Sequence, residues 1–75
     1  MSERVQIEGP ASGKRLFWTK KVGAHVKEGE MVASYEEAKR TQGIPSPATG
    51  TLTEIAIDNG ALTQGGKPIG FITVD

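Results

Sequence analysis

The chain has 75 residues, nine basic residues balanced by nine acidic ones, one histidine (His25) and no cysteine. This length predicts one domain over residues 1–75, and the composition excludes disulfides, cysteine-ligated metals, thiol catalysis, a histidine metal site and a conventional catalytic triad. Because the first residues lack an apolar signal-peptide core and no apolar run approaches the roughly 20 residues of a membrane span, we expect a soluble, cytoplasmic protein without a membrane partner.

Short apolar segments separated by turn residues predict an all-β fold. In chain order, the expected strands are residues 5–7, 16–19, 31–35, 52–57 and 69–74. The content of ten glycines and four prolines indicates many turns between short strands, and Asn59-Gly60 is the clearest turn signal. Residues 36–40 have a helix-forming composition but are too few to form a stable helix alone.

The sequence contains an internal repeat with an offset of 37 residues. Pro-Ala-Ser-Gly at residues 10–13 recurs as Pro-Ala-Thr-Gly at residues 47–50, and the same offset pairs Gly23 with Gly60 and Gly29 with Gly66. Glycines that recur in register mark positions that need positive φ or close backbone approach. The repeat therefore predicts two similar β units, about residues 7–35 and 44–72, joined by a connector over residues 36–46. The connector has no counterpart in the repeat, so it is the first place to look for function.

The connector and its flanks resemble the biotinyl/lipoyl-attachment domain family. The resemblance rests on residues 29–39, on the Pro-Ala-Thr-Gly of residues 47–50 and on the turn at residues 26–30, and it extends over about residues 7–74. In that family a hairpin lysine carries lipoate or biotin through an amide, with a glutamate three residues before it and a glycine eleven residues after it. Glu36, Lys39 and Gly50 have these spacings. The resemblance implies a flattened, barrel-like sandwich of two four-stranded antiparallel sheets with quasi-two-fold symmetry.

The same resemblance implies a function without catalysis by this chain. Lys39 would be acylated with lipoate by a ligase or transferase, and the arm would carry intermediates between the partner enzymes of a dehydrogenase complex. Glu36 and Glu37 would help the ligase recognise the hairpin. Gly50, by fixing the turn after the hairpin, would set the position of Lys39. Such a carrier needs no catalytic residue and no metal, and it works as a monomer.

Two further hypotheses come from the same family. Ala38-Lys39-Arg40 departs from the Asp-Lys-Ala of most lipoyl domains, and it lacks both methionines of the Met-Lys-Met of biotin carriers. Lipoate is favoured, since carriers of the glycine-cleavage type accept a small apolar residue before the lysine. The alternatives are a biotin carboxyl carrier of a carboxylase complex, modified by a biotin ligase, and an unmodified docking module. Gly43, in the strand that returns from the hairpin, is expected to loosen that strand.

A hypothesis of another class is a small β-barrel that binds single-stranded nucleic acid. Phe17 and Trp18 stand beside Lys20 and Lys21, and aromatic side chains next to lysines are how such barrels stack bases over a basic face. Strand alternation puts Phe17 on the face opposite Trp18, however, and the formal net charge of +0 offers little attraction for phosphates. We therefore expect no nucleic-acid partner.

Overall fold

The structure, a computed structural model, describes residues 3–75 as an all-β fold. Its seven strands are β1 (Arg4–Ile7), β2 (Leu16–Trp18), β3 (His25–Val26), β4 (Met31–Glu37), β5 (Arg40–Pro45), β6 (Gly50–Ile55) and β7 (Gly70–Val74). They form two antiparallel sheets, one in the order β1-β7-β6-β3 and one in the order β2-β4-β5. The predicted fold class is confirmed. Within residues 3–75 there is no helix long and apolar enough to cross a membrane.

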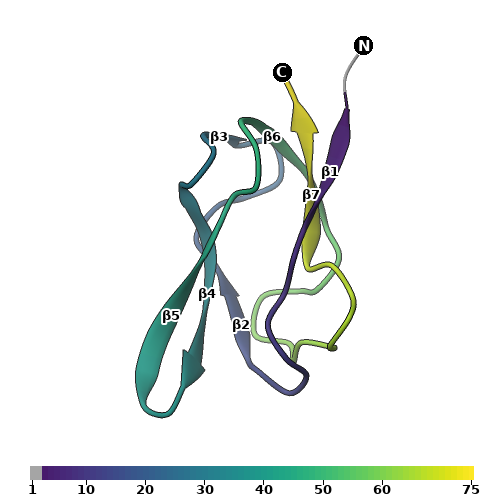
Figure 1. Ribbon diagram of the computed structural model, residues 1–75. Coiled ribbons are helices and arrows are strands. Elements are labelled where there is room, and N and C mark those ends of the chain that lie inside the picture. Colours follow the sequence, from purple (N-terminus) through teal and green to yellow (C-terminus); the bar gives the residue numbers. More distant parts are fainter. Residues whose placement is uncertain (1–2) are drawn as a thin grey trace.

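The two sheets pack face to face over a small apolar core (Figure 1). Alternation along the strands turns every second side chain inward, which fills the space between the sheets with aliphatic groups. Trp18 and Tyr35 close the core at its margin, where both are half-buried. The nine buried apolar residues are Ile7, Leu16, Val26, Val32, Ala33, Ile44, Leu52, Ile69 and Ile72.

The second sheet differs from the expected four strands. In the described part of the chain it has three strands, and the place of a fourth beside β2 is taken by a single bridge between Leu62 and Arg15. The segment around Leu62 lies between Gly60 and Gly66, whose φ angles are +84° and +82°. Backbone hydrogen bonds still join this segment to residues 14–16, from the Leu16 amide to the Ala61 carbonyl and from the Thr63 amide to the Lys14 carbonyl, although no fourth strand of the second sheet forms in residues 3–75.

The turn glycines of the two halves adopt matching conformations. φ is +98° at Gly23 and +84° at Gly60, and it is +88° at Gly29 and +82° at Gly66. No atom lies within 4 Å of a Cβ built on any of the four, so their requirement for glycine is conformational. The internal repeat is thus present in the backbone as well as in the sequence.

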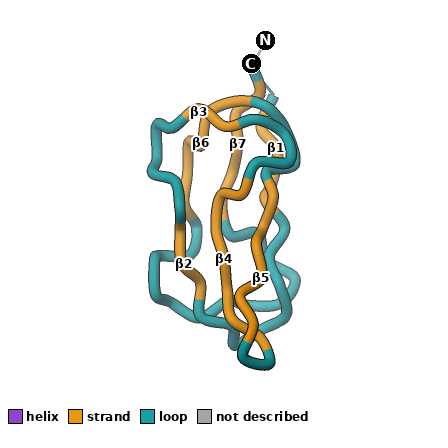
Figure 2. The backbone as a smooth tube through the Cα atoms, turned by 90° about the vertical axis from the view of Figure 1, so that its left-hand side faces the viewer, coloured by secondary structure: helices purple, strands orange, loops and turns teal. Residues whose placement is uncertain are grey.

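The molecule is elongated, with extents of 40 × 19 × 16 Å. The start of β1 and the end of β7 lie together at one end of the long axis, and the turn between β4 and β5 lies at the other (Figures 1 and 2). Any attachment to a longer polypeptide through the chain ends would therefore leave the β4–β5 turn free.

Candidate functional site

The candidate site is the hairpin formed by β4 and β5. In its register Glu36 pairs with Thr41 and Glu37 pairs with Arg40, which leaves Ala38 and Lys39 as a two-residue turn. Lys39 is exposed, and none of the ion pairs within residues 3–75 involves it. The hairpin thus presents the amine of Lys39 at one end of the long axis of the molecule (Figure 2).

The backbone of this turn is unusual for its sequence. φ is +51° at Ala38 and +64° at Lys39, and these are the two non-glycine residues with positive φ in the described chain. Two-residue hairpin turns with positive φ at both positions favour Asn-Gly, because a Cβ in the left-handed region is crowded by the carbonyl oxygen. The cost is about 1 kcal/mol per residue or more. Strain of this kind persists where a site needs it, which makes the tip the strongest functional candidate.

The two glutamates before the turn face opposite ways, as alternation predicts. Glu37 turns toward the loop after β1, where its Oε1 lies 3.5 Å from Nζ of Lys14. Glu36 lies across from Thr41 on the other face of the hairpin and is exposed. The structure therefore brings both glutamates beside Lys39 but gives only Glu37 an ionic partner among the described residues.

Lys14 is held in place by a buried threonine from the second half of the chain. Thr63 is 3% exposed, and its Oγ1 accepts a hydrogen bond from the Lys14 amide at 3.0 Å. The same hydroxyl donates to the carbonyl of Ala11 at 2.6 Å, and the Thr63 amide donates to the carbonyl of Lys14 at 2.7 Å. The loop after β1 is thereby anchored, and its lysine reaches the hairpin from a fixed backbone. The sequence did not single out Lys14, whose only signal is that it follows the repeated Pro-Ala-Ser-Gly.

Gly50 follows the bends at residues 47–49 that come after the hairpin, and its expected influence on the position of Lys39 stays a prediction. It is the first residue of β6, inside the four-stranded sheet, where it pairs with Val26 of β3 and Val74 of β7. A Cβ at this position would lie 2.1 Å from the carbonyl oxygen of Thr73. Gly50 is therefore needed because the backbone of β7 approaches it closely, which is a requirement of the fold.

Gly43 does not leave an open gap in β5. A Cβ built on Gly43 would lie 2.8 Å from Cε and 3.2 Å from Sδ of Met31, so the methionine side chain lies over the glycine. The expected loosening of the strand is offset by this contact, because Met31 covers backbone that glycine would otherwise expose.

The aromatic residues near the lysines do not form a stacking surface. Trp18 packs against the core, and its Nε1 donates to the carbonyl of Ile57 at 2.7 Å, whereas Phe17 points to the opposite face and is 40% exposed. Lys20 is paired with Glu30 at 2.6 Å. That hydrogen bond is the largest cause of the lowered pKa of Glu30, and a bond from the backbone amide of Lys27 adds to it. The arrangement is structural and offers no basic aromatic platform.

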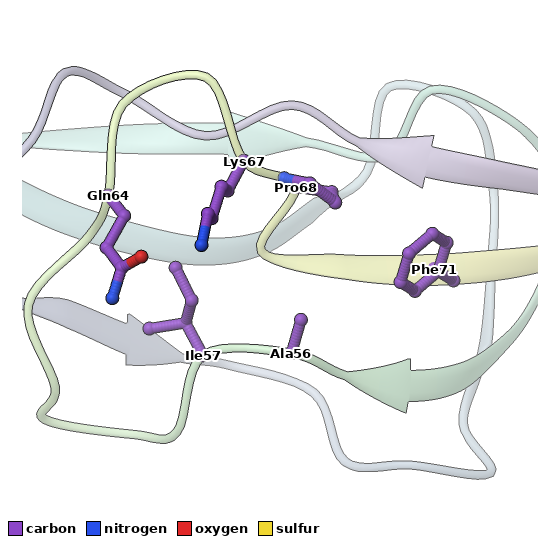
Figure 3. A pocket seen from close by; sticks show the side chains of 6 residues that line it. All are labelled: Ala56, Ile57, Gln64, Lys67, Pro68 and Phe71. Carbon is purple, nitrogen blue, oxygen red and sulfur yellow. The ribbon is translucent and has the colours of Figure 1, made fainter.

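A hollow of about 350 Å³ lies on the second half of the chain (Figure 3). In the repeat, Lys20 and Glu30 of the first half correspond to Ile57 and Lys67 here. The ion pair of the first half, with 2.6 Å between Nζ of Lys20 and Oε2 of Glu30, therefore has no counterpart at the second position. The hollow is lined by Ala56, Ile57, Gln64, Lys67, Pro68 and Phe71.

His25 is exposed in β3, and its Nε2 lies 2.7 Å from Oδ2 of Asp75. No group of three or more histidine, aspartate or glutamate side chains suited to a metal ion occurs in residues 3–75.

Comparison with known proteins bears on this geometry. The family described as "Biotin-requiring enzyme" matches residues 5–72. The chain is 36% identical over 70 residues to the succinyltransferase component (dihydrolipoyllysine-residue) of the human mitochondrial 2-oxoglutarate dehydrogenase complex, covering 87% of this chain and 16% of that protein. It is 37% identical over 60 residues to the dihydrolipoyllysine-residue acetyltransferase component of the acetoin cleaving system of Bacillus subtilis, covering 80% of this chain and 15% of that protein.

A solved structure gives the same fold. The structure of a single-chain, multi-domain long-chain acyl-CoA carboxylase matches 96% of this chain and 7% of its own, with a TM-score of 0.81 and 15% sequence identity. At this identity the likeness concerns the fold alone. The chain spans 15–16% of the length of the two curated relatives named above, so it corresponds to a small part of each.

Proposed function

Because this chain belongs to the biotinyl/lipoyl-attachment family of domains, we propose that it is a swinging-arm carrier whose lipoyl group is attached to Lys39. The observation that carries the proposal is the exposed lysine in a strained two-residue turn, at the end of the molecule opposite the chain ends. Lipoate and biotin are both joined through a lysine amine, and the free side chain of Lys39 fits that requirement.

The geometry suits a carrier because the sheets supply a rigid support and the exposed turn supplies a mobile lysine side chain. The packed sheets hold the hairpin rigid, and the exposed turn gives the lysine side chain freedom to reach into another protein's active site. When bound, a lipoyl group supplies a dithiolane that can carry acyl groups, aminomethyl groups or reducing equivalents. Tethering turns a bimolecular encounter into one at high effective concentration, so the carrier itself needs no catalytic pocket.

Lipoate is the proposed group because the relatives support it. Their names describe dihydrolipoyllysine-residue acyltransferase components, which supports lipoate over biotin. The carboxylase whose structure is similar supports only the fold. The two alternatives, a biotinylated chain and an unmodified chain, are therefore tested by the same mass measurement.

The proposed partners follow from the same relatives. A lipoate–protein ligase or transferase would modify Lys39, and the enzymes of a 2-oxo acid dehydrogenase or acetoin-cleaving system would use the arm. Acylation joins the carboxyl carbon of lipoate to Nζ of Lys39 through an amide, with loss of an amine proton and of the group that activates the carboxyl. ATP supplies that activation in the ligase reaction. Glu36 and Glu37, which flank the turn on its two faces, would be contacts for the ligase.

Intact-mass measurement tests the proposal. The chain would be incubated with a lipoate–protein ligase, lipoate and ATP, and in parallel with a biotin–protein ligase, biotin and ATP. We expect the mass of one lipoyl group on the wild type and on Lys67→Arg, an exposed lysine of another turn, and none on Lys39→Arg. A mass increase of one biotinyl group in place of a lipoyl group would identify biotin as the attached group. No increment with either ligase, or an increment that persists in Lys39→Arg, would refute the carrier proposal.

A further inference from the structure

We propose that the outer face of the β2-β4-β5 sheet, marked by the exposed side chains of Phe17 and Met31, is the surface on which the acylating ligase docks to reach Lys39. This inference rests on the proposed function, because it concerns how the ligase that modifies Lys39 would bind the β2-β4-β5 sheet. It adds a recognition surface that lies outside the hairpin turn and its two glutamates.

The register of the sheet places the marked side chains in one row. Phe17 pairs with Ser34, and Ser34 pairs with Gly43 on the next strand. Residues directly paired across an antiparallel sheet point to the same side. Phe17 is 40% exposed between the buried Leu16 and the half-buried Trp18, so this side is the one turned away from the core.

Met31 belongs to the same outer row although it lies on a different part of β4. Its terminal atoms lie over Gly43, within 2.8 to 3.3 Å of where a Cβ would be. A register shift between Met31 and Ala33 breaks the alternation and allows this orientation. Met31 is nevertheless 50% exposed, so it covers the glycine and still presents apolar surface to solvent.

The apolar face continues at the edge of the sheet. Leu62 bridges to Arg15, which alternates with the buried Leu16 and so points outward with Phe17. Leu62 is 54% exposed. Three of the four large apolar side chains that are exposed in residues 3–75 therefore lie on the outer side of this one sheet, and the fourth, Val22, lies in the loop after β2.

The face is continuous with the attachment hairpin. The next row toward the turn contains Glu36 and Thr41, and the turn with Lys39 follows it. Ser34 lies about 17 Å from Lys39 along β4, at 3.4 Å per residue. A standard interface buries about 800 Å² per partner, which corresponds to a patch about 32 Å across. One such patch covers both Lys39 and the Phe17 row.

The other face of the hairpin offers less room for a partner. There Glu37 meets Lys14, and Lys14 belongs to the loop that Thr63 anchors. The outer face carries no such loop contact with the hairpin among the described ion pairs, so an enzyme that encloses the Lys39 side chain can extend along it. Apolar residues of the enzyme would then remove Phe17 and Met31 from water, and phenylalanine and methionine are among the residue types enriched at protein interfaces.

The test compares ligase kinetics for Phe17→Ser with those for Val22→Ser, a matched loss of an exposed apolar side chain. Initial rates would be measured with a lipoate–protein ligase, lipoate and ATP at varied concentrations of the chain. We expect Phe17→Ser to raise KM for the chain about tenfold, with kcat within about twofold of wild type, and Phe17→Leu to restore KM. Val22→Ser should leave both parameters unchanged. Thermal unfolding of each variant verifies that it is folded.

Other results would overturn the inference. Equal KM values for Phe17→Ser, Val22→Ser and wild type would remove this face from ligase recognition while leaving the carrier proposal intact. A concentration-dependent dimer in analytical ultracentrifugation that Phe17→Ser abolishes would assign the face to a second copy of the chain. If the wild type accepts neither lipoate nor biotin, the proposed function fails and the docking surface fails with it. If it accepts biotin alone, KM values measured with the biotin ligase support or overturn the docking surface by the same criteria.

Discussion

Nζ of Lys14 lies 3.5 Å from Oε1 of Glu37, so an ion pair joins the anchored loop after β1 to the hairpin two residues before Lys39. The two side chains are 28% and 51% exposed. Ion pairs with this much solvent access stabilise a protein by less than about 1 kcal/mol, because water and salt screen them. The Lys14–Glu37 pair therefore adds little to the stability of the fold.

The first prediction concerns the energy of this pair. A double-mutant cycle with Lys14→Gln and Glu37→Gln should give a coupling free energy of about 0.2 to 1 kcal/mol in urea unfolding at low salt. The coupling should fall toward zero in about 1 M NaCl, where the Debye length is only about 3 Å. A coupling above about 2 kcal/mol that resists salt would show that the pair is a structural element of the fold.

The second prediction concerns the strained turn. Ala38→Asn should raise the free energy of unfolding by roughly 0.5 to 1 kcal/mol, because asparagine tolerates the left-handed region that Ala38 occupies at φ +51°. Ala38→Val should lower it by more than about 1 kcal/mol, since a branched Cβ is crowded most there. Urea unfolding of the two variants measures both effects. Similar stabilities for Asn, Ala and Val at this position would mean that the turn is not left-handed in solution.

A third prediction separates two glycines that occupy the same place in the repeated motif. Gly50→Ala should destabilise the chain by at least about 3 kcal/mol or prevent folding, because the new Cβ would lie 2.1 Å from the carbonyl oxygen of Thr73. Gly13→Ala should cost only about 1 kcal/mol, because Gly13 has φ +82° but nothing lies within 4 Å of its added Cβ. Denaturant unfolding compares them. If the two variants lose equal stability, the close approach of β7 to Gly50 is not what requires glycine.

The fourth prediction concerns pH. The Lys20 hydrogen bond and the Lys27 amide lower the pKa of Glu30 in the folded chain, so folding favours its ionised form. This contribution to stability is complete above the usual pKa of a glutamate, near pH 4.3, and is lost as the pH falls through the lowered value. The stability of Glu30→Gln should therefore fall less than that of wild type between pH 6 and about pH 3.

The control for the pH prediction is Glu28→Gln, an exposed glutamate of the same turn. Its stability should follow the wild-type pH profile in urea unfolding at each pH. An identical pH profile for Glu30→Gln and wild type would contradict the coupling of Glu30 to Lys20.

Several features of the fold could be predicted because they are local. Five of the seven strands in residues 3–75 correspond to the short apolar segments read from the sequence, whereas β3 and β5 do not. The Ala38-Lys39 turn between β4 and β5 lies within the predicted connector. The repeated glycines predicted turns, and Gly23 and Gly60 have the positive φ that explains them. The family resemblance, with Glu36 three residues before it, made Lys39 the candidate attachment residue. That role is still a prediction.

The interactions around the hairpin depend on the tertiary structure. Lys14 and Glu37 are far apart in sequence, and only the packing of the loop after β1 against the second half brings them together. The same holds for Gly50, because only the packing of β7 beside β6 reveals the close backbone approach that requires glycine there. Met31 could not be placed over Gly43 either, because a register shift breaks the period-two pattern on which such a prediction depends.

The sequence by itself therefore determined that this small chain is an all-β repeat with a lysine in the connector between its halves. Glycine positions, apolar alternation and spacing along the chain contain that information, since each acts over a few residues. Only the tertiary structure decided that Ala38 and Lys39 share a strained turn at the far end of the molecule from the chain ends, and that Phe17 and Met31 are exposed on the sheet behind it. These depend on strand register and sheet packing, which join residues distant in sequence.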